Sequence, residues 1–225
     1  MNKRSRKKKT PLLGVSLFAS SGIGDLAIRE AGVNVVVANE FLPDRADLFR
    51  SNYPECEMIQ GDIRERLHEI VRTAQKRLGA ENLDVLFATP PCQGMSKNGR
   101  GKLLRGVRDG LRDALDPRNQ LATFVPPIVH KLKPKMIIFE NVPEMDGTLV
   151  ENENGNLVEL LDHLAMELSD YIGVWKVIEF ANYGVPQRRQ RLITFFVRKD
   201  VAKARAIGTT DQLSQAVFPL PTHAS

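Results

Sequence analysis

Short apolar runs alternate with longer amphipathic segments over most of this chain. The apolar runs are typical of buried strands, and the segments between them are typical of helices. We expect strands at 13–18, 33–39, 57–60, 83–88, 135–140, 173–180 and 191–198. We expect helices at 25–31, 44–51, 61–78, 119–132 and 156–168. The alternation predicts an α/β fold with a mixed, mostly parallel seven-stranded sheet, helices on both faces, and ligands at the carboxyl ends of the strands.

The length and composition suit one globular α/β domain, or at most two small ones. The chain has 225 residues, of which 42% are hydrophobic and 26% charged, and it can bury a sizeable core. No apolar run approaches the ~20 residues of a membrane span, and the N-terminus lacks the apolar core of a signal peptide, so we expect a cytoplasmic protein. The two cysteines, Cys56 and Cys92, and the absence of zinc-ligand spacing predict neither a disulfide framework nor a metal site.

Positive charge is concentrated at the N-terminus. Six of the first ten residues are basic and none is acidic, whereas the rest of the chain carries 26 basic and 27 acidic residues. The formal net charge of +5 is therefore no sign of a basic domain surface. The basic segment is either a solvated arm or a nucleic-acid contact.

A candidate nucleophile lies in the run Pro90-Pro91-Cys92-Gln93-Gly94-Met95-Ser96. The run follows an apolar strand, and its two prolines restrict the backbone on either side of each ring. Cys92 would therefore sit at a stiff corner between a strand and a loop, with its sulfur held in place. The alternative is a small, inert, buried cysteine at a strand end.

A candidate cofactor turn follows the first strand. Phe18, Gly22 and Gly24 precede a helix, and Glu40 lies at the end of the next strand, where a carboxylate can bind ribose hydroxyls. Asp62 occupies the corresponding place after the third strand. The spacing is not a full dinucleotide fingerprint, so a nucleoside without a pyrophosphate, such as S-adenosylmethionine, fits better. The alternative is a tight strand-to-helix connection.

Six motifs in order resemble those of cytosine-5 DNA methyltransferases. They are 17–24, Glu40, 61–63, 90–96, 116–121 with 140–142, and 187–191, and the similarity spans about residues 12 to 223. It implies the Rossmann-like fold of S-adenosylmethionine-dependent methyltransferases. Ser20 stands where the family usually has the first glycine of the cofactor loop, and a serine fits there if its φ is negative.

The resemblance also implies roles for individual residues. Cys92 would be the thiolate that adds to carbon 6 of cytosine, Glu140 would contact the N3 edge, and Asn141 would orient the loop. Arg189 and Arg191 would bind the O2 atom of the base and a neighbouring phosphate. The residues implied for S-adenosyl-L-methionine are Phe18 against the adenine, Glu40 on the ribose, Asp62 at the adenine amino group, the glycines Gly22 and Gly24 in the turn, and Ile63, Pro91 and Leu121 lining the pocket. A helix cap at Glu140 and a solvated arginine pair are the alternatives.

The segment 97–112 contains six basic residues, four glycines and one acidic residue. Such a composition suits a segment that closes over a phosphate backbone. A cytosine inside a duplex cannot reach a thiolate at a strand end, so the base must be flipped. We expect DNA contacts from Gln93, Ser96, Arg100 and Lys102. An ordinary surface loop is the alternative.

In that family a target-recognition domain follows the catalytic part, and a last motif completes the cofactor pocket. This sequence stops at Ser225, before both, which implies the larger subunit of a split enzyme or a truncated fragment. We expect a basic tail at 1–11, a catalytic domain at 12–200 and an outgoing segment at 201–225. The expected partners are nucleoid DNA and a second polypeptide that carries the recognition domain and the last motif. A tRNA cytosine methyltransferase and a non-catalytic nucleotide-binding subunit are the alternative functions.

Overall fold

The computed structural model describes residues 11–93 and 116–223. Its strands are β1 (Leu12–Leu17), β2 (Val33–Glu40), β3 (Glu57–Gln60), β4 (Val85–Ala88), β5 (Met136–Asn141), β6 (Leu149–Glu151), β7 (Leu157–Glu159), β8 (Tyr171–Glu179) and β9 (Gln190–Arg198). The α-helices are α1 (Ile23–Glu30), α2 (Pro43–Asn52), α3 (Ile63–Leu78), α5 (Val125–Leu132), α6 (Leu160–Glu167), α7 (Lys199–Ala204) and α8 (Thr210–Val217). Three short 3₁₀ helices are η1 (Asn119–Phe124), η2 (Pro143–Met145) and η3 (Phe180–Tyr183).

Seven of these strands form one sheet in the order β3-β2-β1-β4-β5-β9-β8. The first five in that order are parallel, whereas β9 runs antiparallel to both β5 and β8. The chain moves outward from β1 to β3 and then returns to the other side of β1 with β4. This reversal between β1 and β4 is the place where open α/β sheets bind their ligands.

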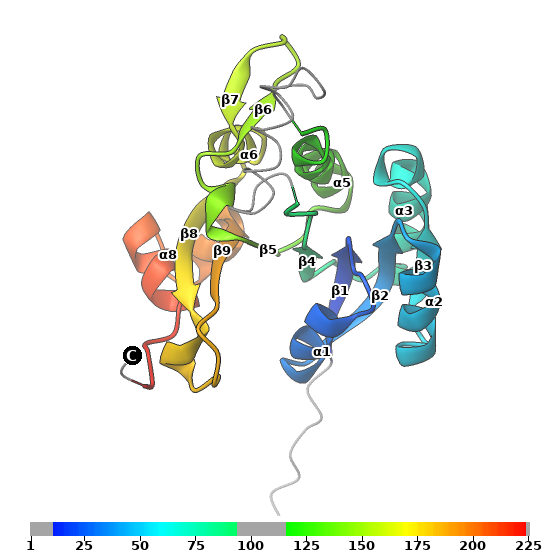
Figure 1. The fold of residues 1–225 in the computed structure, drawn as a ribbon, viewed down its shortest axis with the longest axis horizontal. Helices are drawn as coiled ribbons and strands as arrows, with labels where there is room; N and C mark the ends of the chain where they lie inside the picture. The colour runs from blue at the N-terminus through cyan, green and yellow to red at the C-terminus, as the bar shows by residue number, and fades with distance from the viewer. Residues whose placement is uncertain (1–10, 94–115, 224–225) are drawn as a thin grey trace, which may run out of the picture.

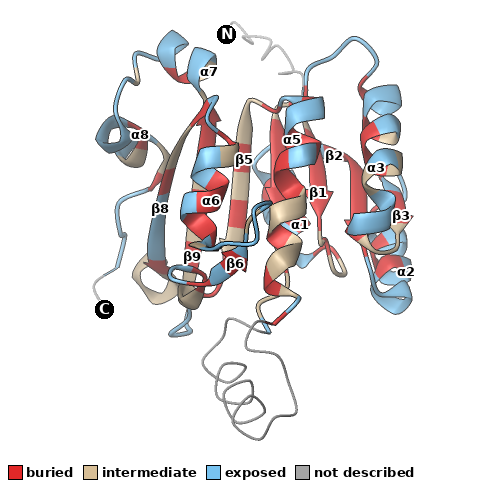
Figure 2. Ribbon diagram, turned by 90° about the horizontal axis from the view of Figure 1, so that it is seen from above, coloured by how far each residue is buried: buried red, intermediate tan, exposed pale blue. Residues whose placement is uncertain are grey.

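Helices cover both faces of the sheet (Figure 1). Residues of α3, α5 and α6 pack with β1, β4 and β5 in one cluster, around side chains such as Ile70, Ile128 and Leu164. Residues of α1 and α2 pack on the opposite face, where Phe49 is fully buried. The central strands are therefore buried on both sides, while the helices expose their outer faces (Figure 2).

The expected fold class is confirmed, and so is the antiparallel pair at the end of the sheet. The strands lie within two residues of the expected ranges. The expected helix at 119–132 begins as the 3₁₀ helix η1 and becomes α-helical at Val125, whose next two residues are prolines. Proline is favoured in a first helical turn because the N–H it lacks has no partner there.

The expectation of one helix over 156–168 is wrong in its first turn. Residues Leu157–Glu159 form β7, which pairs with β6, and α6 begins at Leu160. The hairpin is closed by Asn152, whose Oδ1 accepts the N–H groups of Asn154 and Asn156, and by Gly155 with φ +76°. A three-residue strand has too few positions for its alternation to be distinguished from the start of a helix.

The boundary expected at residue 200 stays a prediction. In the structure α7 and α8 lie beyond β9, and Leu213 of α8 is buried against Val174 and Ile178 of β8. The side chain of Thr209 accepts the N–H of Gln212, and the Gln212 side chain accepts the N–H of Thr209, so α8 begins with a capping box. Part of the segment 201–225 therefore packs on the same sheet.

Candidate active site

The sheet brings the candidate site residues to one edge. Because β1 to β5 are parallel, their carboxyl ends lie at the same edge, and because β9 is antiparallel, its amino end lies there too. The loops after β1 and β4 are joined directly, since Thr89 Oγ1 donates to the carbonyl of Phe18 at 2.9 Å. The candidate cofactor turn and the cysteine corner are therefore neighbours.

The cofactor turn has a strained backbone. Phe18 and Ser20 have φ values of +59° and +51°, in the left-handed region, which disfavours residues other than glycine. The condition for a serine to fit here, a negative φ, is not met, because the chain turns through the left-handed region at Ser20. Gly22, at φ +86°, leaves no room for a side chain, since a Cβ atom there would lie 2.2 Å from the ring of Tyr53. The same tyrosine donates its hydroxyl hydrogen to the Gly22 carbonyl at 2.7 Å.

Glu40 anchors this turn. Its side chain is buried, and its carboxylate accepts the N–H of Ser20 at 2.8 Å and the N–H of Leu42 at 2.9 Å. Each carboxylate oxygen has a second lone pair that these two bonds do not use. Glu40 therefore shapes the turn and can still accept hydrogen bonds from a ligand.

Asp62 is the N-cap of α3. Its Oδ1 accepts the N–H of Arg64 at 2.9 Å, and the Arg64 guanidinium donates to both of its oxygens, at 2.9 and 2.5 Å. These hydrogen bonds hold the pKa of the Asp62 carboxyl below its usual range. Ile63, the next residue, is 2% exposed and belongs to the core. An adenine amino group at Asp62 would share the carboxylate with Arg64.

The cysteine corner follows β4. Pro90 is buried, whereas Pro91 and Cys92 are half-buried, and Cys92 packs against the main core cluster. Asn141, at the end of β5, is 2% exposed and donates its Nδ2 hydrogen to the Pro90 carbonyl at 3.0 Å. Asn141 Oδ1 accepts the N–H of Val142 at 2.8 Å. The corner is therefore tied to the neighbouring strand by a buried amide.

Cys92 is the accessible thiol of the two. Cys56 is buried, and burial raises the pKa of its thiol to about 12. A thiol so buried and so weakly acidic is inert.

Glu140 and Arg191 form an ion pair on adjacent strands. Arg191 Nε lies 2.8 Å from Glu140 Oε1, and the two side chains are 17% and 31% exposed respectively. The Arg189 side chain is exposed, and the backbone of Arg189 is bonded on both sides: its N–H donates to Glu179 Oε1 at 2.7 Å, and its carbonyl accepts the N–H of Phe180 at 3.0 Å. The structure therefore brings Glu140, Asn141 and Arg191 together beside the cysteine corner and leaves the Arg189 side chain at the rim.

Of the remaining predicted site residues, Leu121 and Gln93 lie within the described part of the chain, whereas Ser96, Arg100 and Lys102 do not. Leu121 lies in η1, half-buried against the main core cluster, and Gln93 is the last described residue of the cysteine corner. Gln93 Oε1 accepts a hydrogen bond from Arg118 at 2.5 Å. Ser96, Arg100, Lys102 and the basic segment 97–112 lie outside the described residues, as do residues 1–10.

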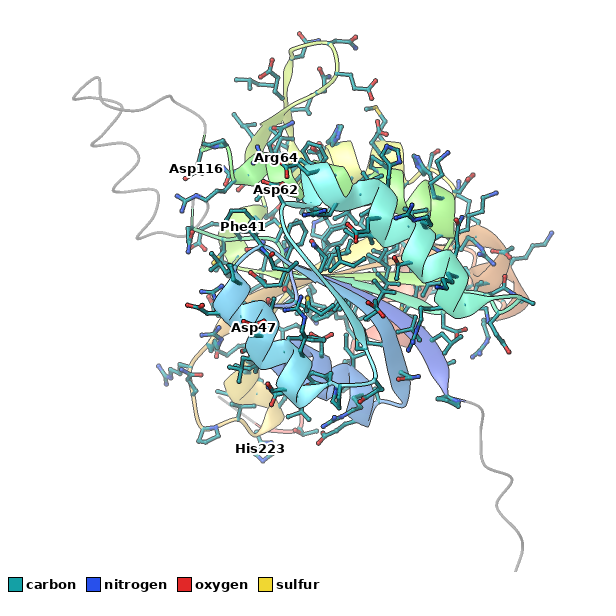
Figure 3. The ribbon with its side chains drawn as sticks, turned by 90° about the vertical axis from the view of Figure 1, so that its right-hand side faces the viewer. Phe41, Asp47, Asp62, Arg64, Asp116 and His223 are labelled. Carbon is teal, nitrogen blue, oxygen red and sulfur yellow. The ribbon has the colours of Figure 1, made fainter. Side chains whose placement is uncertain are left out.

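Two residues at this edge were given no role in the sequence analysis. Phe41 directly follows Glu40, and its side chain is 60% exposed, an apolar ring at the end of a strand beside the candidate ribose ligand. Figure 3 shows Phe41, Asp62 and Asp116 toward the same side of the molecule. The signal that could have found Phe41 is an aromatic residue next to a strand-end acid. The second residue without an assigned role is Arg118, which lies in the connection between β4 and β5.

The strand order, the glycine turn after β1 and the acidic residues after β2 and β3 define a Rossmann-like fold of the S-adenosylmethionine-dependent methyltransferase class. The chain belongs to the C-5 cytosine-specific DNA methylase family, whose model matches residues 13–223. The resemblance noted in the sequence is thus confirmed.

Curated relatives include type II methyltransferases. The chain is 37% identical over 188 residues to M1.HgaI of Avibacterium volantium, a match that covers 82% of this chain and 50% of the relative. It is 30% identical over 216 residues to M.AquIA of Picosynechococcus, covering 93% of this chain and 76% of the relative. The chain spans about half the length of most of the curated relatives it matches.

Solved structures share the fold. A protein described as a DNA modification methyltransferase of an Escherichia coli prophage superposes with a TM-score of 0.65 at 23% identity, over 94% of this chain and 56% of that one. A DNMT2 variant of Spodoptera frugiperda gives 0.59 at 20% identity, over 84% of this chain and 50% of its own. In the described ranges, no helix has the length and apolar character needed to cross a membrane.

Proposed function

We propose that this chain is the catalytic part of a DNA (cytosine-5-)-methyltransferase of the restriction-modification type. The observation that supports this most is the constellation at one sheet edge: a half-buried thiol at a corner held by Asn141, beside the Glu140–Arg191 ion pair. A nucleophile, an acidic group and a cation within one constellation suit attack on a polarised ring. The family to which the chain belongs has this chemistry in its name.

In the proposed reaction Cys92 bonds as a thiolate to carbon 6 of a flipped cytosine. The ring becomes an enamine, whose carbon 5 can take up a methyl group; loss of the carbon 5 proton and of the thiolate then restores the ring. As the thiolate adds, the Glu140 carboxyl group passes a proton to N3, so that the neutral enamine forms, and it takes that proton back when the ring is restored; Arg191 holds the Glu140 side chain in place. Arg189 is left to bind the phosphate backbone.

S-adenosyl-L-methionine would supply the methyl group. The residues present fit it, because Glu40 keeps unused lone pairs at the end of β2, Asp62 accepts hydrogen bonds at the end of β3, and Phe41, which follows Glu40, offers an exposed ring. Phe18, with its carbonyl bonded to Thr89, would bring the adenine side of the pocket next to the cysteine corner. Ile63, Pro91 and Leu121 would supply its apolar lining.

We further propose that a second polypeptide, or a part of the protein beyond this sequence, supplies DNA sequence recognition. This proposal is supported by the length of the relatives, because most of them are about twice as long as the region that this chain matches. Specific readout needs side chains placed against base edges.

The test is methyl transfer from labelled cofactor to a mixed-sequence DNA and, separately, to tRNA. The expected result is slow labelling of DNA at the carbon 5 position, spread over many sequences, with tRNA unlabelled. Labelling of tRNA alone would favour the tRNA enzyme, and robust labelling of one defined DNA sequence by this chain alone would refute the need for a separate recognition part. Cofactor binding without any transfer, even with an added recognition subunit, would indicate the non-catalytic alternative.

A further inference from the structure

Arg118 joins two parts of the site edge that are 25 residues apart in sequence. Its Nη1 donates to Gln93 Oε1 at 2.5 Å, while Nε and Nη2 donate to the two oxygens of Asp116, at 2.8 and 2.5 Å. Its backbone N–H donates to Asp116 Oδ1 as well, at 2.9 Å. Because Asp116 is 6% exposed, the guanidinium is held by a carboxylate that is itself fixed in the fold.

This anchored cation is bonded to the residue that follows the thiol. Gln93 is the next residue after Cys92, so the bond from Arg118 acts within one peptide of the sulfur. The pKa of Arg118 lies above its ordinary value, chiefly because of its hydrogen bonds to Asp116, and negative charge on the Cys92 sulfur adds to the rise. Arg118 and a Cys92 thiolate therefore attract each other.

Building on the proposed function, we propose that Arg118 is a positioning residue for Cys92, which holds the Gln93 side of the corner and places a fixed positive charge next to the sulfur. Arginine suits both tasks, because its planar fork can bond Asp116 with two arms and Gln93 with a third. A lysine would keep the charge and lose the fork. A glutamine would lose both.

The experiment compares alkylation of Cys92 by iodoacetate, which is an anion, with alkylation by neutral iodoacetamide. The rate with iodoacetate divided by the rate with iodoacetamide reports the local charge, because changes in thiol exposure or ionisation alter both rates together. Peptide mass spectrometry follows Cys92 separately from the inert Cys56. Because a nearby positive charge attracts the anionic reagent and not the neutral one, the ratio should fall about two- to five-fold in Arg118→Gln and stay close to wild type in Arg118→Lys.

The matched control is Arg198→Gln. Arg198 makes the same two-armed pair with a carboxylate two residues away, Asp200, at 2.7 and 3.0 Å, and it lies at the far end of β9 from Arg191. Its ratio should equal that of wild type. Thermal melting of each variant verifies folding. If Arg118→Gln does not fold, the wild-type ratio is compared with that of a free peptide spanning 89–95, which it should exceed by about the same factor.

An unchanged ratio in folded Arg118→Gln, or a wild-type ratio no higher than that of the peptide, would overturn the proposal. The assay contains no DNA and no cofactor. Its outcome is therefore independent of methyl transfer: a chain that never methylates DNA can still show the charge effect, and an active methyltransferase can lack it.

Discussion

Asp25 is a buried charge without a partner. It lies in the first turn of α1, is 1% exposed, and neither of its oxygens makes a hydrogen bond within the described part of the chain. Burial raises the pKa of its carboxyl from 3.8 to about 6, an effect that the nearby Ser16 hydroxyl only partly offsets, at a geometry short of a hydrogen bond. The folded protein therefore favours the protonated acid.

Because the pKa of Asp25 is raised, we expect the stability of the folded protein to depend on pH through this residue. Asp25 contributes most favourably to the free energy of unfolding below pH ~4, where its carboxyl is protonated in both the folded and the unfolded state. This contribution is lost as the pH rises through about 6. The shift corresponds to roughly 3 kcal/mol at pH 7. Urea unfolding of wild type and Asp25→Asn between pH 4.5 and 7.5 should show the variant gaining stability over wild type as the pH rises. A difference that is constant across this range would contradict the assignment.

Glu40 has two functions that can be separated by a matched pair of variants. Glu40→Ala removes the acceptor of the Ser20 and Leu42 N–H groups, so it should destabilise the fold by about 1–3 kcal/mol and weaken cofactor binding by about 1.5–3 kcal/mol. Asp84→Asn is the control. Asp84 also accepts a backbone N–H, from Leu13 at 2.8 Å, and pairs with Lys135, but it lies at the opposite end of the strands.

Calorimetry with S-adenosylmethionine and urea unfolding, on both variants, measure the two effects. Asp84→Asn should lose stability and keep the wild-type cofactor affinity. Equal losses of cofactor affinity in both variants would mean that Glu40 acts only through the stability of the fold.

At the scale of elements, the buried amide of Asn141 couples β5 to the loop after β4. Asn141→Ala leaves the Pro90 carbonyl and the Val142 N–H without this partner, at a cost of about 1–3 kcal/mol in stability. Tyr171→Phe is the control, because the Tyr171 hydroxyl makes an equally buried bond, at 2.9 Å, to the carbonyl of Pro134, which lies at the opposite end of β5 from Asn141.

Both variants should unfold at lower urea concentrations, and only Asn141→Ala should slow methyl transfer, by about ten-fold or more, because a misplaced nucleophile loses its alignment. Equal transfer rates in the two variants at a temperature where both are folded would remove Asn141 from the positioning of the corner.

The elements that could be predicted from the sequence are those whose apolar residues form a clear run or recur at a regular spacing, and those bounded by glycine or proline. The apolar runs 33–39 and 57–60 became strands, whereas the helix expected over 119–132 is α-helical only from Val125, with two prolines in its first turn. The β6–β7 hairpin could not be predicted because each strand has three residues. The positive φ of Ser20 could not be predicted either, since it depends on Glu40, twenty residues away, accepting the Ser20 N–H.

The same limit applies to the site. The identities of Cys92, Glu140 and Arg191 were visible as motifs, and their meeting follows from strand order, because β9 runs antiparallel beside β5. The contact of Arg118 with Gln93 has no local signature, since it joins two ends of a long connection. Contacts of this kind require the fold.

At the scale of the whole molecule, the sheet separates the two halves of the proposed chemistry and joins them at one point. The acidic residues after β2 and β3 lie on one side of the β1–β4 reversal, and the cysteine corner and the Glu140–Arg191 pair lie on the other. The bond from Thr89 to the Phe18 carbonyl crosses that reversal. A methyl donor on one side would thus face a base held on the other.

The proposed reaction requires a covalent bond between Cys92 and cytosine. The most direct measurement uses DNA in which 5-fluorocytosine replaces cytosine at many positions, with saturating S-adenosylmethionine, followed by peptide mapping of any protein–DNA complex that survives denaturation. Fluorine at carbon 5 blocks the elimination that would free the enzyme, so the complex accumulates even when turnover is slow.

The expected result is a complex linked through Cys92, absent in Cys92→Ser, although that variant binds DNA and cofactor about as well as wild type. A complex linked through another residue, or one that forms equally in Cys92→Ser, would contradict it.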